Sequence, residues 1–214
     1  MAARARIDHL VTSGTFALDG GTWDVDNNVW IVGDDEEAVV IDAAHDAEAI
    51  LTALGGRTLR AILCTHAHND HIDAAPALAD ATGAPILLHP DDLPLWKQTH
   101  PERLPDGELT DGERVLVAGA ELEVLHTPGH APGAVCFHAP SLGTLGTVFT
   151  GDTLFAGGPG ATGRSFSHFP TIIDSIRDRL LTLPPETVVR TGHGDPTTVG
   201  AEGPHLAEWV ARGH

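Results

Sequence analysis

One short segment constrains the fold more than any other part of the sequence. Residues 65–71 read Thr-His-Ala-His-Asn-Asp-His, and they directly follow an apolar run at 60–64 that predicts a strand. Four potential ligands therefore lie within six residues: His66, His68, Asp70 and His71. Three imidazoles in one loop gain little without a cation, so the segment predicts a metal site at a strand end. The alternative interpretation is a polar loop whose histidines only cap the next helix.

Three further loops offer ligands, and each follows an apolar strand. They are Thr127-Pro128-Gly129-His130, Gly151-Asp152-Thr153 and Gly192-His193-Gly194-Asp195. Each motif is common by itself, but four such loops in succession indicate one shared site. We expect one ion to be held by His66, His68 and His130, a second by Asp70, His71 and His193, and Asp152 to lie between them.

This predicted ligand set contains nitrogen and oxygen atoms and no thiolate. Such a set suits zinc, iron or manganese, and the sequence does not choose among them, although zinc is our first expectation. Two divalent ions about 3.5–4 Å apart can hold a hydroxide that is nucleophilic near neutral pH.

The hydrophobic pattern predicts strands and helices in mixed order. We expect strands at 7–13, 15–18, 28–33, 38–42, 60–64, 86–89, 114–118, 121–125, 134–138, 144–150 and 187–190, with helices at 46–55, 70–81, 170–183 and 201–212 and a short helix or loop at 89–97. Two sheets packed face to face, with helices outside, would bury these elements. No low-complexity linker divides the chain, so residues 1–214 are expected to form one domain.

Composition excludes several classes of protein. Hydrophobic residues make up 42% of the 214 residues, which is too many for a disordered chain. The formal charge is 12 − 30 = −18 with no basic run, which argues against nucleic acid or an anionic membrane as the main partner. Met1–Leu10 has no apolar stretch long enough for a signal peptide, and no window of the sequence is long and apolar enough to predict a membrane span. Cys64 and Cys136 each lie in an apolar run. We expect a cytoplasmic protein with reduced, buried thiols.

Taken together, the four ligand motifs resemble those of the metallo-β-lactamase superfamily, and within it the glyoxalase II (hydroxyacylglutathione hydrolase) group. The resemblance covers the chain from about Asn28 to its end. It implies an α+β fold, an αββα sandwich of two mixed β-sheets flanked by helices, with the metal site at one end of the sheets. It also carries over the ligands one by one, as His66, His68, Asp70, His71, His130, Asp152 and His193.

The resemblance implies a dinuclear metal-dependent hydrolase. We expect a metal-bound hydroxide, oriented by Asp70 and held near Asp152, to cleave a thioester of a small thiol of the glutathione or mycothiol type. The alternatives are a mononuclear iron persulfide dioxygenase, a lactonase or phosphodiesterase of the same fold, and a metal-binding module without activity. The complete second ligand set, especially His193, favours hydrolysis. Many true β-lactamases of this superfamily have cysteine where this chain has Asp152, which argues against antibiotic hydrolysis.

Two features depart from glyoxalase II. That group has an additional C-terminal helical region, whereas this chain ends soon after His193, and the chain has no tyrosine to contact glutathione. The abundance of alanine, glycine and arginine suggests a high-GC genome, which makes an acylated mycothiol a possible substrate. The acyl group, the thiol carrier and the oligomeric state stay open.

Several other residues could belong to the site. Arg164 follows a glycine-rich stretch, 158–163, and is expected either to bind a substrate carboxylate or phosphate or to form an ordinary salt bridge. The stretch matches G-x-G-x-x-G but lacks the strand–helix context of a dinucleotide loop. We expect four further histidines to be structural or to line the pocket rather than to bind metal: His45, His89, His126 and His168.

Overall fold

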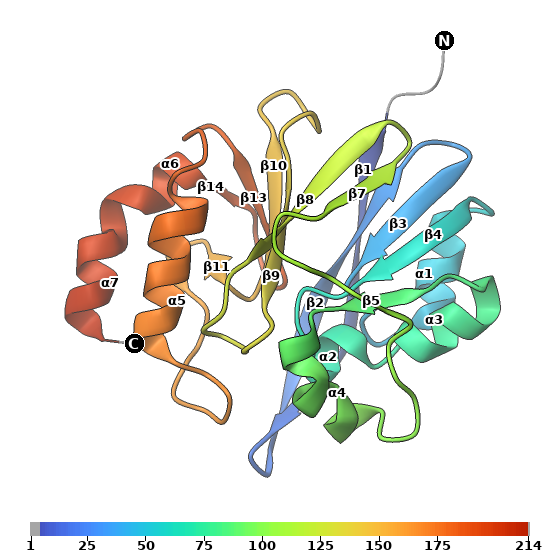
Figure 1. Cartoon of the computed structure of the whole chain (residues 1–214), viewed down its shortest axis with the longest axis horizontal. Coiled ribbons are helices and arrows are strands. Elements are labelled where there is room, and N and C mark those ends of the chain that lie inside the picture. The colour runs from blue at the N-terminus through green and yellow to red at the C-terminus, as the bar shows by residue number, and fades with distance from the viewer. Residues whose placement is uncertain (1–4, 214) are drawn as a thin grey trace.

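Successive apolar residues of the central strands point to opposite faces of the sheet and belong alternately to two different buried clusters. Each sheet is therefore covered by another layer on both faces. Along the strand β2 (Gly21–Gly33), Val29 and Ile31 pack beneath helices, whereas Trp30 and Val32 pack against a second sheet. A strand buried on both faces reads as a continuous apolar run. The computed structural model describes residues 5–213, which form two sheets between two layers of helices (Figure 1).

The first sheet follows the order of the chain and mixes antiparallel with parallel pairs. Its strands are β1 (Arg6–Leu18), β2, β3 (Glu37–Ile41), β4 (Thr58–Leu63), β5 (Ile86–Leu88) and β6 (Gly107–Glu108). The helices on its side of the molecule are α1 (Ala47–Leu54), α2 (Asn69–Ile72), α3 (Ala75–Thr82) and α4 (Leu93–Thr99). Their buried residues include Ile50 and Leu78, which belong to the same apolar cluster as Val29 and Ile31.

The second sheet has the order β14-β13-β10-β9-β8-β7 and is also mixed. Its strands are β7 (Arg114–Val117), β8 (Ala120–His126), β9 (Val135–Ala139), β10 (Thr147–Gly151), β13 (Val188–Thr191) and β14 (Thr197–Thr198), and a small hairpin joins β11 (Leu154–Phe155) to β12 (Gly158–Pro159). The helices α5 (Phe169–Ser175), α6 (Val199–Glu202) and α7 (Leu206–Arg212) lie on its outer side (Figure 1). A third apolar cluster, which includes Ile172 and Trp209, fills the space beneath them.

These layers confirm the expected αββα arrangement of two mixed sheets and flanking helices. The extent of the domain, 1–214, stays a prediction. Residues 1–4, which the prediction about a secretion signal includes, lie outside the described residues. Within the described part, no helix combines the length and apolar character needed to cross a membrane.

The prediction for the first strands was wrong in extent. Strands were expected at 7–13 and 15–18, but β1 runs unbroken over 13 residues and pairs along its whole length with β2, from Arg6 opposite Gly33 to Leu18 opposite Gly21. The polar stretch 22–28 hid the first half of β2, because that half has only partial cover and its residues are mostly exposed. The result is a hairpin whose outer half projects past the sheet at the bottom of Figure 1.

The helix expected at 70–81 is interrupted. It forms α2 and α3, because the Ala74 amide donates to the Ala43 carbonyl and Pro76 starts a new helical turn. The helix expected at 201–212 is likewise divided into α6 and α7 by a 3-10 turn at Gly203–His205, which contains Pro204. The helix expected at 170–183 begins as α5 and continues as a π-type turn over Ile176–Leu180.

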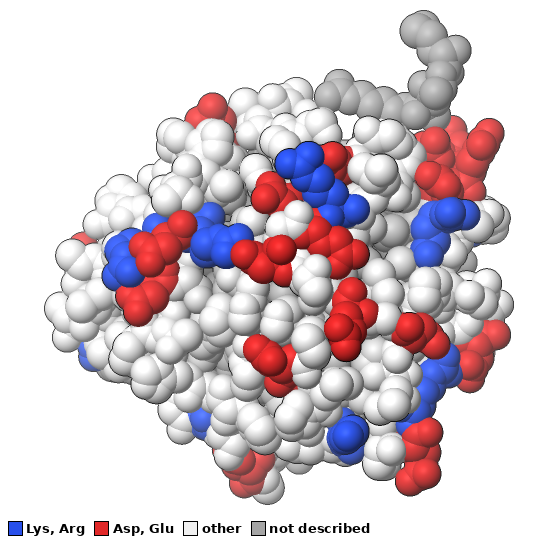
Figure 2. All heavy atoms as spheres, in the orientation of Figure 1, with Lys and Arg blue, Asp and Glu red and all other residues white. Residues whose placement is uncertain are grey.

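No continuous basic surface forms on the face seen in Figure 2, where several basic groups lie next to acidic ones and other acidic groups stand alone. The ion pairs of the described residues include Arg177 with Asp178, at 2.7 Å between Nε and Oδ1, and Arg179 with Asp111, at 2.7 Å between Nη2 and Oδ1.

Candidate metal centre

The four ligand loops meet because they leave the same end of the two sheets. They follow β4, β8, β10 and β13. In the second sheet β10 is parallel to β13, and β8 runs the same way because β8 and β10 are both antiparallel to β9, so these three strands end at the same edge. Two backbone hydrogen bonds then join the sheets at that edge. The Val135 amide donates to the Thr65 carbonyl and the Asn28 amide to the Gly192 carbonyl, each at 2.8 Å.

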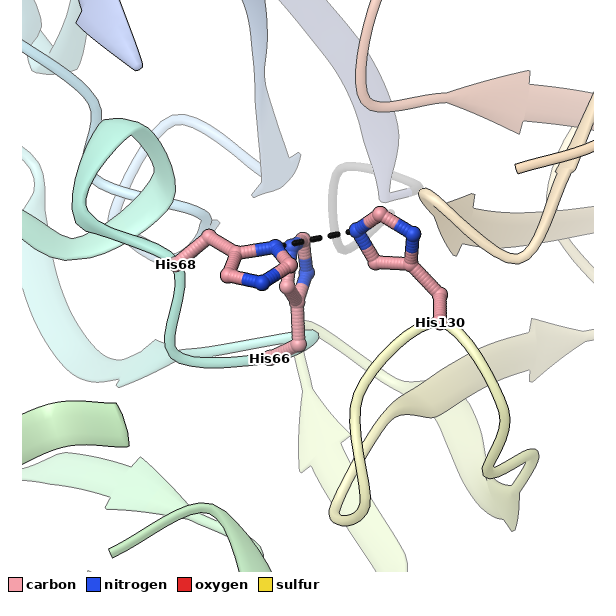
Figure 3. A group of neighbouring side chains, drawn as sticks. All are labelled: His66, His68 and His130. Carbon is pink, nitrogen blue, oxygen red and sulfur yellow. Dashed lines mark hydrogen bonds between the residues drawn. The ribbon is translucent and has the colours of Figure 1, made fainter. Parts of the chain in front are cut away.

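The first predicted set of ligands converges. His66 and His68 come from the loop after β4, and His130 from the loop after β8; Figure 3 shows their rings turned toward one another. Their ring centroids are 4.7–4.9 Å apart, and His130 Nε2 lies 3.0 Å from His68 Nδ1. All three side chains are buried.

The second predicted set converges beside it. His71 Nε2 lies 3.3 Å from His193 Nε2. Asp70 Oδ2 lies 3.5 Å from His71 Nε2 and 3.3 Å from His193 Nε2. Asp70 and His71 are buried on the first turn of α2, whereas the His193 side chain is 25% exposed.

Asp152 touches both sets, as the sequence predicted. Its Oδ1 lies 3.3 Å from His71 Nε2, and its Oδ2 lies 3.6 Å from His130 Nε2 and 3.5 Å from His193 Nε2. A side chain at Gly192 would collide with this carboxylate, so the motif after β13 needs glycine before its histidine. One carboxylate therefore faces donors of both sets.

Outer hydrogen bonds orient the inward-facing histidines. The Nδ1 atoms of His130 and His193 face the carbonyls of Ala161 and Asp26, at 2.9 and 2.7 Å, and must donate to them. His71 Nδ1 faces Asp42 Oδ2 at 2.9 Å.

His66 Nδ1 lies 3.0 Å from the Thr65 hydroxyl, which itself donates to Asp42 Oδ2 at 2.7 Å. These contacts turn inward the Nε2 lone pairs of four rings, those of His66, His71, His130 and His193. Partners of this kind commonly fix the tautomer of metal-binding histidines.

The two sets differ in charge. Burial lowers the pKa of His68 to about 3 and the pKa of His66 well below its usual value, so the first set is neutral. Burial also acts to lower the pKa of His193, but the charge and hydrogen bond of Asp152 outweigh it and raise that pKa to about 10. The pKa of Asp152 is held well below its usual value, because the charges of His71 and His193 overcome its burial. The second set is therefore a place that favours positive charge.

The donor atoms fit divalent metal ions. Buried His66 Nε2, Asp70 Oδ1 and Asp152 Oδ1 have no hydrogen-bond partner among the described residues, which is costly for polar atoms unless a ligand completes them. Ligands about 2.0–2.1 Å from a tetrahedral ion lie about 3.3 Å from one another. The contacts within the sets, from 3.0 to 3.6 Å, match that spacing.

The remaining predicted residues lie away from the donors. The Arg164 guanidinium carbon lies 4.0 Å from the Trp23 ring centroid and 6.0 Å from that of Phe16. His89 and His126 stack in parallel, 4.1 Å apart, and Asp91 lies nearby. Lone pairs in parallel ring planes do not converge on one ion, so this group is a packing contact at the back of the site.

Sequence reasoning missed the residues that support the ligands. Asp42 accepts from the Thr65 amide, the Thr65 hydroxyl and His71, and Asn27 donates to Asp70 Oδ2 at 3.1 Å. His45 connects Asn27 to Asp73, so its expected structural role fits the geometry. Asp42 comes directly after a strand, as the ligand loops do, and that position was the only sequence signal for it.

Comparisons with known proteins agree with this geometry. Residues 22–193 match the family model described as the metallo-beta-lactamase superfamily. The hydroxyacylglutathione hydrolase GloC of Haemophilus influenzae is 33% identical over 82% of this chain and 89% of its own length.

Two solved structures extend the comparison. TTHA1623, in a di-iron-bound form, superposes with a TM-score of 0.75 at 35% identity and covers 90% of this chain and 96% of its own. ETHE1 from Myxococcus xanthus has a TM-score of 0.71 at 26% identity, with coverages of 91% and 83%.

Proposed function

The chain belongs to the metallo-beta-lactamase superfamily, and we propose that it is a dinuclear metal-dependent hydrolase that cleaves a thioester of a small thiol. Metal-dependent hydrolysis follows from the family and its relatives. The thioester is our proposal, supported by the similarity to GloC, which is described as a hydroxyacylglutathione hydrolase. The observation that carries it is the convergence of two complete donor sets on one carboxylate, Asp152.

Each donor set would hold one ion. His66, His68 and His130 would hold the first, Asp70, His71 and His193 the second, and Asp152 would face both. Two divalent cations there would supply a hydroxide near neutral pH and positive charge for the developing oxyanion. Zinc is our proposal for both, with iron or manganese as alternatives.

The protein's own residues would position the reactants. Asp70 Oδ2 faces His71 and His193 and accepts from Asn27, whereas Asp70 Oδ1 has no partner among the described residues, so this carboxylate can contribute to the second donor set and still orient the attacking oxygen nucleophile. A thiol leaving group has a pKa of about 8.5 and departs as the thiolate without a strong acid. A site composed mainly of metal ligands, rather than of proton donors, suits such a leaving group.

Arg164 is the substrate-binding residue that we propose. Its guanidinium lies over Trp23, and Phe16 lies between this pair and His68, 5.6 Å from the Trp23 ring and 5.2 Å from His68. A cation held flat on an aromatic ring keeps its edge free for a carboxylate or phosphate of the substrate.

A cavity beside His68 would receive another part of the substrate. It has a volume of about 440 Å³ and lies between the β1–β2 hairpin tip and α4, where Leu18, Leu95, Gln98 and Thr99 line it. This size is within the range of small-molecule sites.

The second candidate is an iron-dependent persulfide dioxygenase, and the similarity to ETHE1 is the observation that favours it. That reaction would use one ion and leave Asp70, His71 and His193 without a role. The complete second set therefore favours hydrolysis. A lactonase or phosphodiesterase could use the same two donor sets, and substrate tests must separate these activities.

Thiol release by metal-reconstituted protein tests the proposal. The substrates are lactoyl- and formyl-glutathione, their mycothiol counterparts and a plain acyl thioester. We expect turnover of one carrier well above the others, and an Arg164→Ala variant should raise KM for a carrier that bears a carboxylate but not for the plain thioester. Absence of thiol release from all of them would overturn the thioesterase proposal. Oxygen consumption by the iron-loaded protein with a persulfide would then support the second candidate.

A further inference from the structure

Asp92 is a buried carboxylate that belongs to neither donor set. It lies at the start of α4, its side chain is inaccessible to solvent, and no salt bridge to it is present among the described residues. Burial raises its pKa to about 6, although two backbone amides donate to its oxygens. A polar group buried in this way needs such hydrogen bonds.

The two amides that Asp92 accepts from belong to the two loops that carry the first donor set. Oδ2 accepts from the Ala67 amide at 2.8 Å, and Ala67 stands between His66 and His68. Oδ1 accepts from the Gly133 amide at 2.5 Å, in the turn at 131–134 that directly follows His130. One side chain thereby fixes the distance between these loops.

The surroundings of Asp92 are shaped for this contact. A Cβ at Gly133 would lie 2.7 Å from the Asp92 nitrogen and 3.0 Å from its Cβ, so only glycine allows the close approach. The stacked rings of His89 and His126 join the same two segments, and His126 Nε2 donates to the Pro132 carbonyl at 3.0 Å.

The second donor set has supports that do not include Asp92. Asn27 holds Asp70, Asp42 holds His71, and the Asp26 carbonyl holds the His193 ring. None of these contacts involves Asp92. A change at Asp92 should therefore disturb one metal site and spare the other.

We propose that Asp92 is a positioning residue that aligns the first metal site by fixing the loop of His66 and His68 against the loop of His130. This inference rests on the two-metal site of the proposed function. It deepens that proposal, because it assigns the alignment of the first ion to a residue outside the ligands that makes none of the contacts supporting the second set.

The test measures metal affinity in backgrounds that keep one site each. Asp92→Asn keeps the shape of the side chain, but its amide nitrogen must face one of the two N–H donors. In a His193→Ala background, which retains the first set, we expect Asp92→Asn to weaken zinc binding by about 10- to 100-fold, as loss of an outer partner does. In a His130→Ala background, which retains the second set, the affinity should change by less than about twofold.

Asn27→Ala is the matched control, and it should show the opposite selectivity because it supports Asp70. Competition with a chromogenic chelator reports the affinities without any substrate. Gly133→Ala replaces Asp92→Asn if the latter does not fold, and the same selectivity is expected. Equal weakening in both backgrounds, or none in the first, would overturn the role of Asp92. Failure of the unmodified protein to bind two ions would instead contradict the proposed function.

Discussion

Asp152 is the residue that contacts both donor sets of the proposed metal centre. Its two oxygens face His71 on one side and His130 and His193 on the other, at 3.3–3.6 Å. Against the effect of burial, its charge helps to raise the pKa values of His71 and His193. No other described carboxylate contacts both sets. Loss of this side chain should therefore affect the two ions together.

We predict that Asp152→Ala lowers the metal content of the protein below two ions per chain. Loss of a residue that only hydrogen-bonds to a metal ligand reduces activity by about 10- to 100-fold, and Asp152→Ala should reduce kcat by more than that. Elemental analysis and thiol release measure the two effects. Asp195→Ala is the control, because Asp195 is an exposed carboxylate of the neighbouring loop, and it should behave like the unmodified protein. Full activity of Asp152→Ala would contradict the assignment.

The two cysteines give a second prediction at the scale of single residues. Cys64 and Cys136 are free and fully buried, and burial raises the pKa of Cys136 to about 11 and that of Cys64 well above its usual value. Both thiols should thus stay protonated and unreactive toward a thiol reagent at pH 8. Unfolding in denaturant should expose two reactive thiols per chain, and rapid labelling of the folded protein would contradict the burial.

Single residues also show how far the sequence could predict the site. The seven residues predicted as ligands could be picked out because each stands in a short motif at a strand end; their role as ligands stays a prediction. Asp92 and Asn27 could not be predicted. Their hydrogen-bond partners, Ala67 and Asp70, lie 25 and 43 residues away along the chain, and only the completed sandwich brings each pair together. Arg164 was predicted only as one of two alternatives, since its contact with Trp23 requires the long hairpin that the sequence did not reveal.

At the scale of the elements, the central strands hold the ligand loops in place because both of their faces are buried. Phe137 on β9 packs between the sheets, while its neighbour Cys136 faces the outer helices. Apolar runs predicted most of these strands. The hairpin and the divided helices were not predicted, since β2 has a polar half and α3 begins only where Ala74 meets Ala43.

We predict that Phe137→Ala lowers the free energy of unfolding by about 3–5 kcal/mol, because it leaves a cavity between the two sheets. Leu116→Ala is a suitable control: Leu116 is on β7 and 70% exposed, so its loss should change the free energy by about 0.5 kcal/mol or less. Denaturant unfolding of the metal-free proteins measures both. Equal effects would contradict the layered core.

For the whole molecule, charge and metal binding are connected. The chain carries a formal charge of −18, and two divalent ions would cancel four negative charges at the site. The ions would also join loops of both sheets, because His66, His68, Asp70 and His71 follow the first sheet and the remaining ligands follow the second. Metal binding should therefore stabilise the sandwich as a unit.

We predict that removal of metal by a chelator lowers the thermal midpoint and destabilises the protein by about 3–4 kcal/mol relative to protein with free zinc at 100 to 1,000 times its Kd. Adding zinc back should restore the midpoint. The His193→Ala variant should recover less, because it lacks one ligand of the second set. An unchanged midpoint after complete removal of metal would contradict this coupling.

The two-metal site can be observed by locating the bound metal in crystals of the zinc-loaded protein. Anomalous scattering should reveal two ions about 3.5–4 Å apart. One should be bound by His66, His68 and His130, the other by Asp70, His71 and His193, with Asp152 touching both. A single ion at full metal loading, or ions bound elsewhere, would contradict the two-metal site on which the proposed hydrolysis depends.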